Sequence, residues 1–229
     1  MNLLKAMLIA PAVIALAAAC TPREPVNQVE NRGHEMPWRQ VITFTPCTVA
    51  DTSRIFADGV VPDPGAAPIE YTVQPDKETG ELVKSNPVTL QRGRWYRMQI
   101  ALYNQQGALI TQAYLTAEQA PLHQFFFNCT QLLNPTDRYP SPIESQVTYK
   151  YADALTLNGV RQPMGFDGVL QVLPTATQSE FNLRCRLVHV IPPAVKTDAQ
   201  GNFYPFDAPG KHIIGVTDLD LQLPVRVQE

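Results

Sequence analysis

The sequence predicts an all-β fold, an antiparallel two-sheet β-sandwich that is immunoglobulin-like or related, with a β-barrel as the runner-up. Three observations predict it. The 229 residues include 21 prolines, roughly twice the ordinary frequency, and proline interrupts long helices. Apolar and polar residues alternate in the proline-free stretches, and turn residues separate these stretches. No repeat and no break in composition divides the rest, so a single β domain over residues 39–229 is expected.

The first 19 residues form a predicted lipoprotein signal peptide. Met1–Lys5 is short and positive, and Ala6–Ala19 is apolar but too short to span a bilayer. The run ends in Leu16-Ala17-Ala18-Ala19-Cys20, which resembles the lipobox of bacterial lipoproteins. We therefore expect Cys20 to be acylated and to attach the protein to a membrane through its lipid. The alternative is ordinary cleavage after Ala19, which would leave Cys20 free.

The residues after Cys20 indicate the membrane and the linker. Thr21 stands where an aspartate tends to mark retention at the inner membrane, so the outer membrane is favoured. The choice between its periplasmic and its surface face stays open. Residues 20–38 lack periodicity and contain three prolines, which is typical of a tether.

The clearest strand is Trp95–Asn104, in which Tyr96, Met98, Ile100 and Leu102 face one way. The turn Asn104–Gly107 follows, and Ala108–Leu115 is expected to return as the hairpin partner. Further strands are predicted at Val41–Thr45, Ile69–Gln74, Leu122–Asn128, Val147–Tyr151, Gly168–Leu173, Phe181–Val190 and Leu219–Val227. Eight to ten strands fit the pattern.

Charge and motifs exclude several classes of function. The 18 Lys and Arg against 21 Asp and Glu give a net charge of −3, which excludes nucleic-acid binding driven by bulk charge. The chain contains no nucleophile elbow, no phosphate-binding loop and no zinc-protease helix motif. We therefore expect a protein that is not an enzyme.

The chain has four histidines, and none stands at a metal-ligand spacing to another. No metal site and no cofactor are therefore expected from spacing alone. His34 falls in the tether, His212 in an expected surface turn, and His189 at a strand end. His123 opens a run that is apolar on both faces and is therefore expected in a central strand. It is interpreted as a hydrogen-bonded structural residue, with a ligand contact as the alternative.

Three carboxylates are candidate functional groups: Asp153, Asp218 and Asp220. They are the only plausible acids for a hydrolase or for a cation site, although exposed carboxylates at a strand edge are more common. Asp218 and Asp220 alternate with leucines, so both are expected on the polar face of the last strand. We hypothesise that His123 and Asp218 are structural partners, and that His189 and Asp220 belong to the same ligand-binding or structural polar network.

Lipidation of Cys20 leaves three cysteines, and the bacterial envelope is oxidising. Cys47 and Cys129 both lie near expected strand ends, so a Cys47–Cys129 disulfide is the preferred prediction. Cys185 has the apolar parity of its strand and is expected to be a buried free thiol.

Several segments in this order resemble an uncharacterised family of Gram-negative, Bacteroidetes-type envelope lipoproteins. They are Val41–Pro46, Gly93 to Tyr96, the His-Gln-Phe-Phe-Phe strand at 123–127, Tyr149–Tyr151 with Asp153, Pro163–Gly165, Leu187–His189, and Gly215–Asp220 with its Thr-Asp-Leu-Asp sequence. The resemblance implies a small envelope domain and brings no catalytic residues. Some members carry histidine-rich segments early in the chain, which hint at metal or haem.

These observations predict a non-catalytic outer-membrane lipoprotein that binds a ligand or serves as an accessory module in nutrient uptake or surface interaction. An outer-membrane receptor is a possible partner, and the small-molecule ligand is left unidentified. The alternatives are a metal- or haem-binding lipoprotein, a purely structural envelope protein, and a hydrolase on a β scaffold. Convergence of polar residues in three dimensions would separate them.

Overall fold

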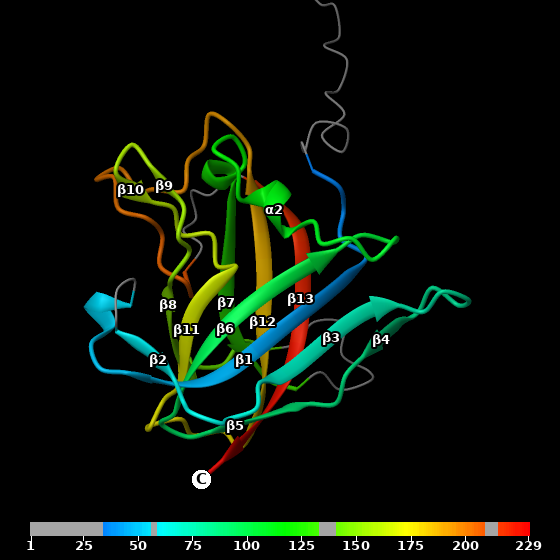
Figure 1. The fold of residues 1–229 in the computed structure, drawn as a ribbon, viewed down its shortest axis with the longest axis vertical. Helices are drawn as coiled ribbons and strands as arrows, with labels where there is room; N and C mark the ends of the chain where they lie inside the picture. Colours follow the sequence, from blue (N-terminus) through cyan, green and yellow to red (C-terminus); the bar gives the residue numbers. More distant parts are fainter. Residues whose placement is uncertain (1–33, 56–58, 133–140, 209–214) are drawn as a thin grey trace, which may run out of the picture. The chain divides into compact units, whose positions relative to one another are not determined.

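The computed structural model describes residues 34–55, 59–132, 141–208 and 215–229, which form an all-β sandwich (Figure 1). The fold prediction is confirmed. The signal peptide, Cys20 and His212 lie outside the described residues. The folded unit begins at His34 and not at residue 39, because residues 34–38, expected in the tether, pack against the domain. None of the helices in the described residues is long and apolar enough to cross a membrane.

One sheet has seven strands in the order β4-β3-β1-β6-β11-β8, with β2 also paired to β1. All its pairings are antiparallel. The strands are β1 (Arg39–Val49), β2 (Val60–Pro62), β3 (Ile69–Pro75), β4 (Leu82–Lys84), β6 (Trp95–Tyr103), β8 (Val147–Tyr151) and β11 (Asp167–Val172). A short 3₁₀ helix, η1 (Thr52–Arg54), follows β1.

The second sheet has four strands in the order β5-β13-β12-β7. They are β5 (Val88–Gln91), β7 (His123–Thr130), β12 (Glu180–Val190) and β13 (Gly215–Gln228). β5 runs parallel to β13, so the sandwich is not antiparallel throughout. A separate two-stranded ribbon is formed by β9 (Thr156–Leu157) and β10 (Val160–Arg161).

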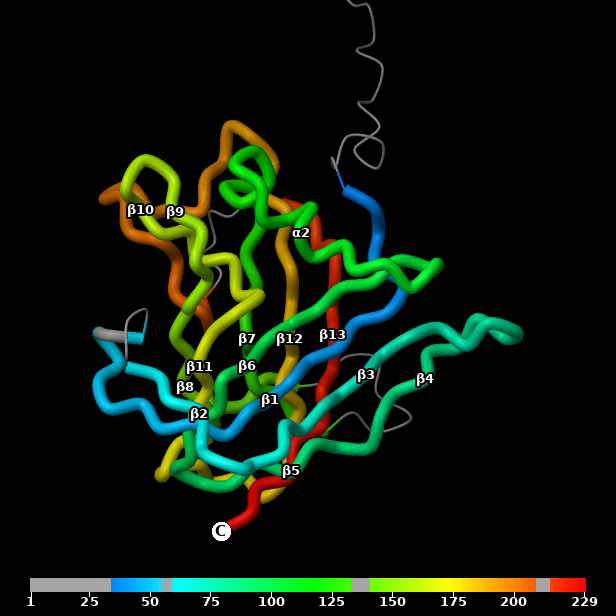
Figure 2. The backbone as a smooth tube through the Cα atoms, viewed as in Figure 1, coloured from blue at the N-terminus to red at the C-terminus, as the bar shows by residue number. Residues whose placement is uncertain are grey.

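The core lies between the two sheets, whose strands cross obliquely in the view of Figure 2. Alternate residues of β1 and β6 supply one wall, and alternate residues of β7, β12 and β13 supply the other. These buried residues include Ile42, Phe44, Met98, Ile100, Phe125, Phe127, Leu183, Cys185 and Leu223. The inward parity of each strand therefore decides which side chains can meet in the interior.

The prediction that Ala108–Leu115 returns as a hairpin strand is wrong. It forms a single bridge, between Tyr103 and Leu109, and then one helical turn, α2 (Thr111–Tyr114). The Thr111 hydroxyl accepts the Leu102 N–H at 2.9 Å, so a side chain replaces the ladder partner there. This turn buries Tyr114 completely.

His123 does open a strand in which every residue except Asn128 is buried, but β7 is an edge strand and not a central one. Loop backbone covers its outer edge instead of another strand. The Phe125 N–H donates to the Met164 carbonyl and the Phe127 N–H to the Phe206 carbonyl, both at 2.7 Å. Covering an edge in this way satisfies its backbone groups and allows side chains that are apolar on both faces.

The preferred disulfide is also wrong, because Cys47, Cys129 and Cys185 are all buried free thiols. Cys47 lies on β1 in a small cluster with Ile55 and Val169, whereas Cys129 lies on β7 in the main core. The two strands belong to different sheets, so proximity to strand ends did not bring the sulfurs together. Cys185 is buried and free, as predicted.

Candidate metal centre

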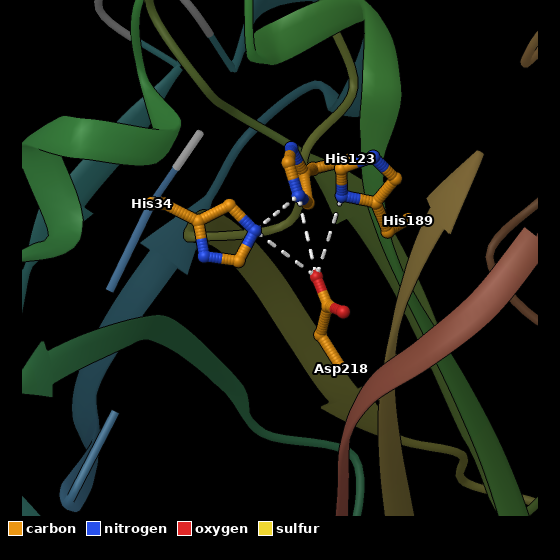
Figure 3. Close-up of side chains that lie close together, drawn as sticks. All are labelled: His34, His123, His189 and Asp218. Atoms are coloured by element: carbon orange, nitrogen blue, oxygen red, sulfur yellow. Dashed lines mark hydrogen bonds and ion pairs between the residues drawn. The ribbon is translucent and has the colours of Figure 1, made fainter. Parts of the chain in front are cut away.

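Four side chains from four separate segments converge at one end of the sandwich: His34, His123, His189 and Asp218 (Figure 3). One candidate ligand atom from each lies within 4.8 Å of all the others. It is the one such group of histidine, cysteine and carboxylate side chains found within the described ranges. The residue spacing along the chain gave no indication of it.

His123 and His189 are placed by strand register. They are directly opposite each other in the β7–β12 pairing. His123 has the inward parity of Phe125 and Phe127, and His189 has that of Leu187. The two imidazoles therefore continue the apolar inner face of the four-stranded sheet to its end, where cross-strand neighbours come close.

Asp218 is placed by a β-bulge. The β12–β13 pairing passes from Leu187 opposite Leu219 to Val188 opposite Thr217, so Asp218 is the additional residue of the bulge. A bulge re-aims a side chain. Asp218 is accordingly buried, whereas Asp220, which the alternation placed on the same face, is exposed and paired with Arg184 through its carboxylate.

His34 comes from the irregular segment before β1. This segment is attached at the Trp38 N–H, which donates to the Tyr103 carbonyl at 2.8 Å. The His34 ring packs on Tyr114 of α2, with ring centroids 4.2 Å apart. The segment therefore reaches over the end of the sandwich and presents His34 to the three residues of the other sheet.

The polar atoms of the four residues lie close together in a buried site. His34 Nε2 and His123 Nε2 are each 3.3 Å from Asp218 Oδ2, and His189 Nδ1 is 3.7 Å from it. The two Nε2 atoms are 3.0 Å apart. The side chains of His34, His123 and Asp218 are completely inaccessible to solvent, and that of His189 is 10% exposed.

The hydrogen bond of His123 Nδ1 decides which ring nitrogen carries the proton. Nδ1 is 2.8 Å from the Gln119 carbonyl, which can only accept, so Nδ1 carries a proton. Burial lowers the pKa of His123, opposed by the Asp218 carboxylate and the Gln119 carbonyl. The ring is therefore neutral at neutral pH, and its Nε2 lone pair points into the cluster.

Asp218 supplies a negative charge, opposite to that of a metal cation. Burial acts to raise the pKa of Asp218, but the three histidines outweigh burial and hold that pKa well below its usual range. The carboxylate is thus ionised. His189 Nδ1 is buried and makes no hydrogen bond. A carboxylate oxygen, a neutral imidazole lone pair and an orphaned ring nitrogen facing one another favour a cation between them.

The spacing of these atoms fits a tetrahedral ion. With metal–ligand distances typical of zinc, the ligand atoms of a tetrahedron are about 3.3 Å apart. Four of the six separations, from 3.0 to 3.7 Å, lie around that value, and all six are within 4.8 Å. The His123 Nδ1–H bond to a backbone carbonyl is also the outer contact that orients metal-bound histidines in general.

Lys196 supports the strand that carries His123. Its buried Nζ donates to the carbonyl oxygens of Ala120 at 2.8 Å, His123 at 3.0 Å and Pro163 at 3.2 Å. Ala120 belongs to η2 (Ala120–Leu122), which leads directly into β7. One side-chain nitrogen thus holds together three segments at the point where the His123 ring enters the site.

The other sequence candidates lie elsewhere. Asp153 is buried and accepts backbone N–H bonds from Met164, Gly165, Phe166 and Asp167 at 2.7 to 3.2 Å. It therefore organises a loop, and the three carboxylates considered for a hydrolase do not converge.

Sequence reasoning missed His34 entirely. The available signal was weak: a single histidine shortly before Trp38, an aromatic residue of the type that packs onto a domain.

Comparisons of this chain with protein-family models, with curated proteins and with solved structures give no match. The functional argument therefore rests on the geometry of the four residues.

Proposed function

We propose that this protein is a non-catalytic metal-binding lipoprotein of the outer membrane, which holds one divalent transition-metal ion on His34, His123, His189 and Asp218. The observation that carries the proposal is the convergence of one ligand atom from each residue within 4.8 Å in a buried site. The segments that supply them are distant in the sequence, so the fold itself assembles the ligand set.

The donor atoms favour a particular class of metal. Three imidazole nitrogens and one carboxylate oxygen suit zinc and its first-row neighbours, whereas magnesium and calcium prefer all-oxygen sites. The tetrahedral spacing favours zinc as the reference ion. Haem is disfavoured, because a porphyrin needs open space in front of a ring nitrogen. Here His34 Nε2 and His123 Nε2 face each other at 3.0 Å.

The closed coordination supports binding rather than catalysis. Catalytic zinc sites keep a position open for water or substrate, whereas four protein ligands fill a tetrahedral site. Three of the four ligand side chains here have no solvent exposure. The ion would therefore serve as structure or as cargo. An accessory role beside an outer-membrane receptor in nutrient uptake agrees with that chemistry.

The direct test uses purified protein loaded with zinc and measured by native mass spectrometry and chelator competition. We expect one ion per chain, and we expect Asp218→Asn to weaken binding by at least about tenfold, since loss of even an outer-shell partner has that effect. Asp220→Asn, two residues along the same strand, is the matched control and should bind as the wild type does. Equal binding by wild type and Asp218→Asn would reject the site.

The membrane attachment is tested separately. Metabolic labelling with a palmitate analogue should mark the wild type, because the lipobox resemblance implies acylation of Cys20. Label that survives in Cys20→Ser would contradict a lipid anchor at this residue and leave the metal site unaffected.

A further inference from the structure

The ligand set divides into two unequal parts. His123, His189 and Asp218 lie on three adjacent strands of one sheet, β7, β12 and β13. His34 stands alone on residues 34–38, which precede the first strand of the other sheet. We call residues 34–38 the N-terminal clasp.

The sheet part is held by regular structure. β12 pairs along its length with β13 and with β7, and Lys196 fixes the start of β7 through the His123 carbonyl. Withdrawing any of these three ligands would break ladder hydrogen bonds of the sheet. They form a preformed half-site.

The clasp lies outside the β ladders and is held by individual contacts. Its Trp38 N–H donates to the Tyr103 carbonyl. The Glu35 carboxylate accepts a hydrogen bond from Asn104 Nδ2 at 3.1 Å, and the Glu35 carbonyl accepts one from the Tyr114 hydroxyl at 3.3 Å. The Pro37 carbonyl accepts one from Gln40 Nε2 at 3.3 Å. Glu35 and Met36 are exposed. Segments with few buried contacts and few backbone hydrogen bonds open at the lowest free-energy cost.

Access to the ion must therefore involve the clasp. The side chains of His34, His123 and Asp218 are closed to solvent, so an ion can reach all four ligands only after something moves. The clasp is the ligand-bearing part whose displacement leaves both sheets intact. Its return brings the fourth ligand and covers the site at once.

We infer that metal binding and docking of the N-terminal clasp are a single coupled event, so that the ion regulates how the start of the domain is held. This rests on the proposed function. The ion would fasten residues 34–38 to the four-stranded sheet, and loss of the ion would release them. By linkage, each favours the other by the same factor. With lipid on Cys20, metal occupancy would thus set where the chain leaves the domain on its way to the membrane.

The test is limited proteolysis of the full-length protein in detergent with a glutamate-specific protease, with products identified by mass. Zinc should slow cleavage after Glu35 at least tenfold. Cleavage after Glu81, which is exposed, should not respond to zinc and serves as the internal control. In His34→Ala and in His34→Gln, zinc should no longer protect Glu35, and zinc affinity should fall.

The outcomes separate the two proposals. Absence of zinc binding by the wild type would remove the metal function itself. Zinc binding with unchanged cleavage after Glu35, or with equal affinity in both His34 variants, would leave the metal on the three sheet ligands and overturn the coupling. Protection of Glu35 that is lost in both His34 variants supports it. Circular dichroism of the variants establishes that the sandwich is retained.

Discussion

His34 Nε2 and His123 Nε2 lie 3.0 Å apart, although 89 positions separate the two residues in the chain. Both atoms also lie 3.3 Å from the same oxygen of Asp218. Because Nδ1 of His123 donates to the Gln119 carbonyl, neutral His123 has no proton for that oxygen. An ion among these atoms resolves the conflict.

Zinc should stabilise the folded protein. An ion that binds only the native state, at a free concentration a hundred times its dissociation constant, adds about 2.7 kcal/mol to the free energy of unfolding. For a domain of this size the melting temperature should rise by roughly 5 to 10 °C. Differential scanning fluorimetry with and without a chelator measures the change. An equal rise in Asp218→Asn would show that the effect arises at another site.

Lys196→Met should destabilise the fold. The substitution leaves three carbonyl oxygens, two of them in buried hydrogen bonds, without their common donor, and each buried orphaned group costs about 1 to 3 kcal/mol. Urea denaturation should show a loss of at least about 2 kcal/mol in the free energy of unfolding, together with weaker zinc binding, since the start of β7 loses its anchor. Lys84→Met removes an exposed lysine and should change neither. Unaltered stability of Lys196→Met would contradict the assigned role.

Asp153 should make stability depend on pH. Burial raises its pKa to about 6 against the lowering effect of four backbone N–H groups, from an ordinary value of 3.8. Between these values the native state binds more protons than the unfolded state. Its contribution is therefore fully present below pH 3.8 and is lost as the pH rises through about 6, by about 3 kcal/mol in total.

Comparison with Asp153→Asn isolates this contribution, because the amide does not titrate and all other groups are shared. The free energy of unfolding of the wild type, minus that of the variant, should fall as the pH rises from 4 to 7. A difference that stays constant or rises over this range would show that the carboxylate is ionised in the native state throughout.

Cys47, Cys129 and Cys185 should be free thiols that react with a thiol reagent only after unfolding. Burial raises the pKa of Cys47 to about 11 and raises the pKa values of Cys129 and Cys185, so reaction with a disulfide reagent should be slow in the native state. When the Cys20→Ser variant is denatured without a reducing agent, three thiols per chain should react with the reagent. A single equivalent would indicate a disulfide, such as the Cys47–Cys129 pair expected from the sequence.

The longer strands were predictable because apolar and polar residues alternate along them. Trp95–Tyr103 alternates between buried and more exposed residues, as its side chains indicate, whereas Glu180–Val190, expected to border solvent on one face, is buried over most of its length. The short strands Val60–Pro62 and Leu82–Lys84 were missed, because three residues at a sheet edge with little burial carry no readable period. β5 was missed as well, although its residues alternate.

The site was only half predictable. The parity of His123 and His189 placed them on apolar faces, and register brings them opposite each other. Asp218 was expected to face outward with Asp220, because a bulge between Leu187 and Val188 leaves no trace in a pattern of alternation. His34 could not be found, since its position depends on how the chain before β1 closes over the other sheet.

The most direct test of the metal centre is the X-ray absorption spectrum of the zinc-loaded protein at the zinc edge. We predict four nitrogen and oxygen neighbours at about 2.0 to 2.1 Å, with the outer-shell scattering of three imidazole rings. A shell of six oxygen neighbours without imidazole scattering, or a sulfur neighbour at about 2.3 Å, would contradict a site formed by His34, His123, His189 and Asp218.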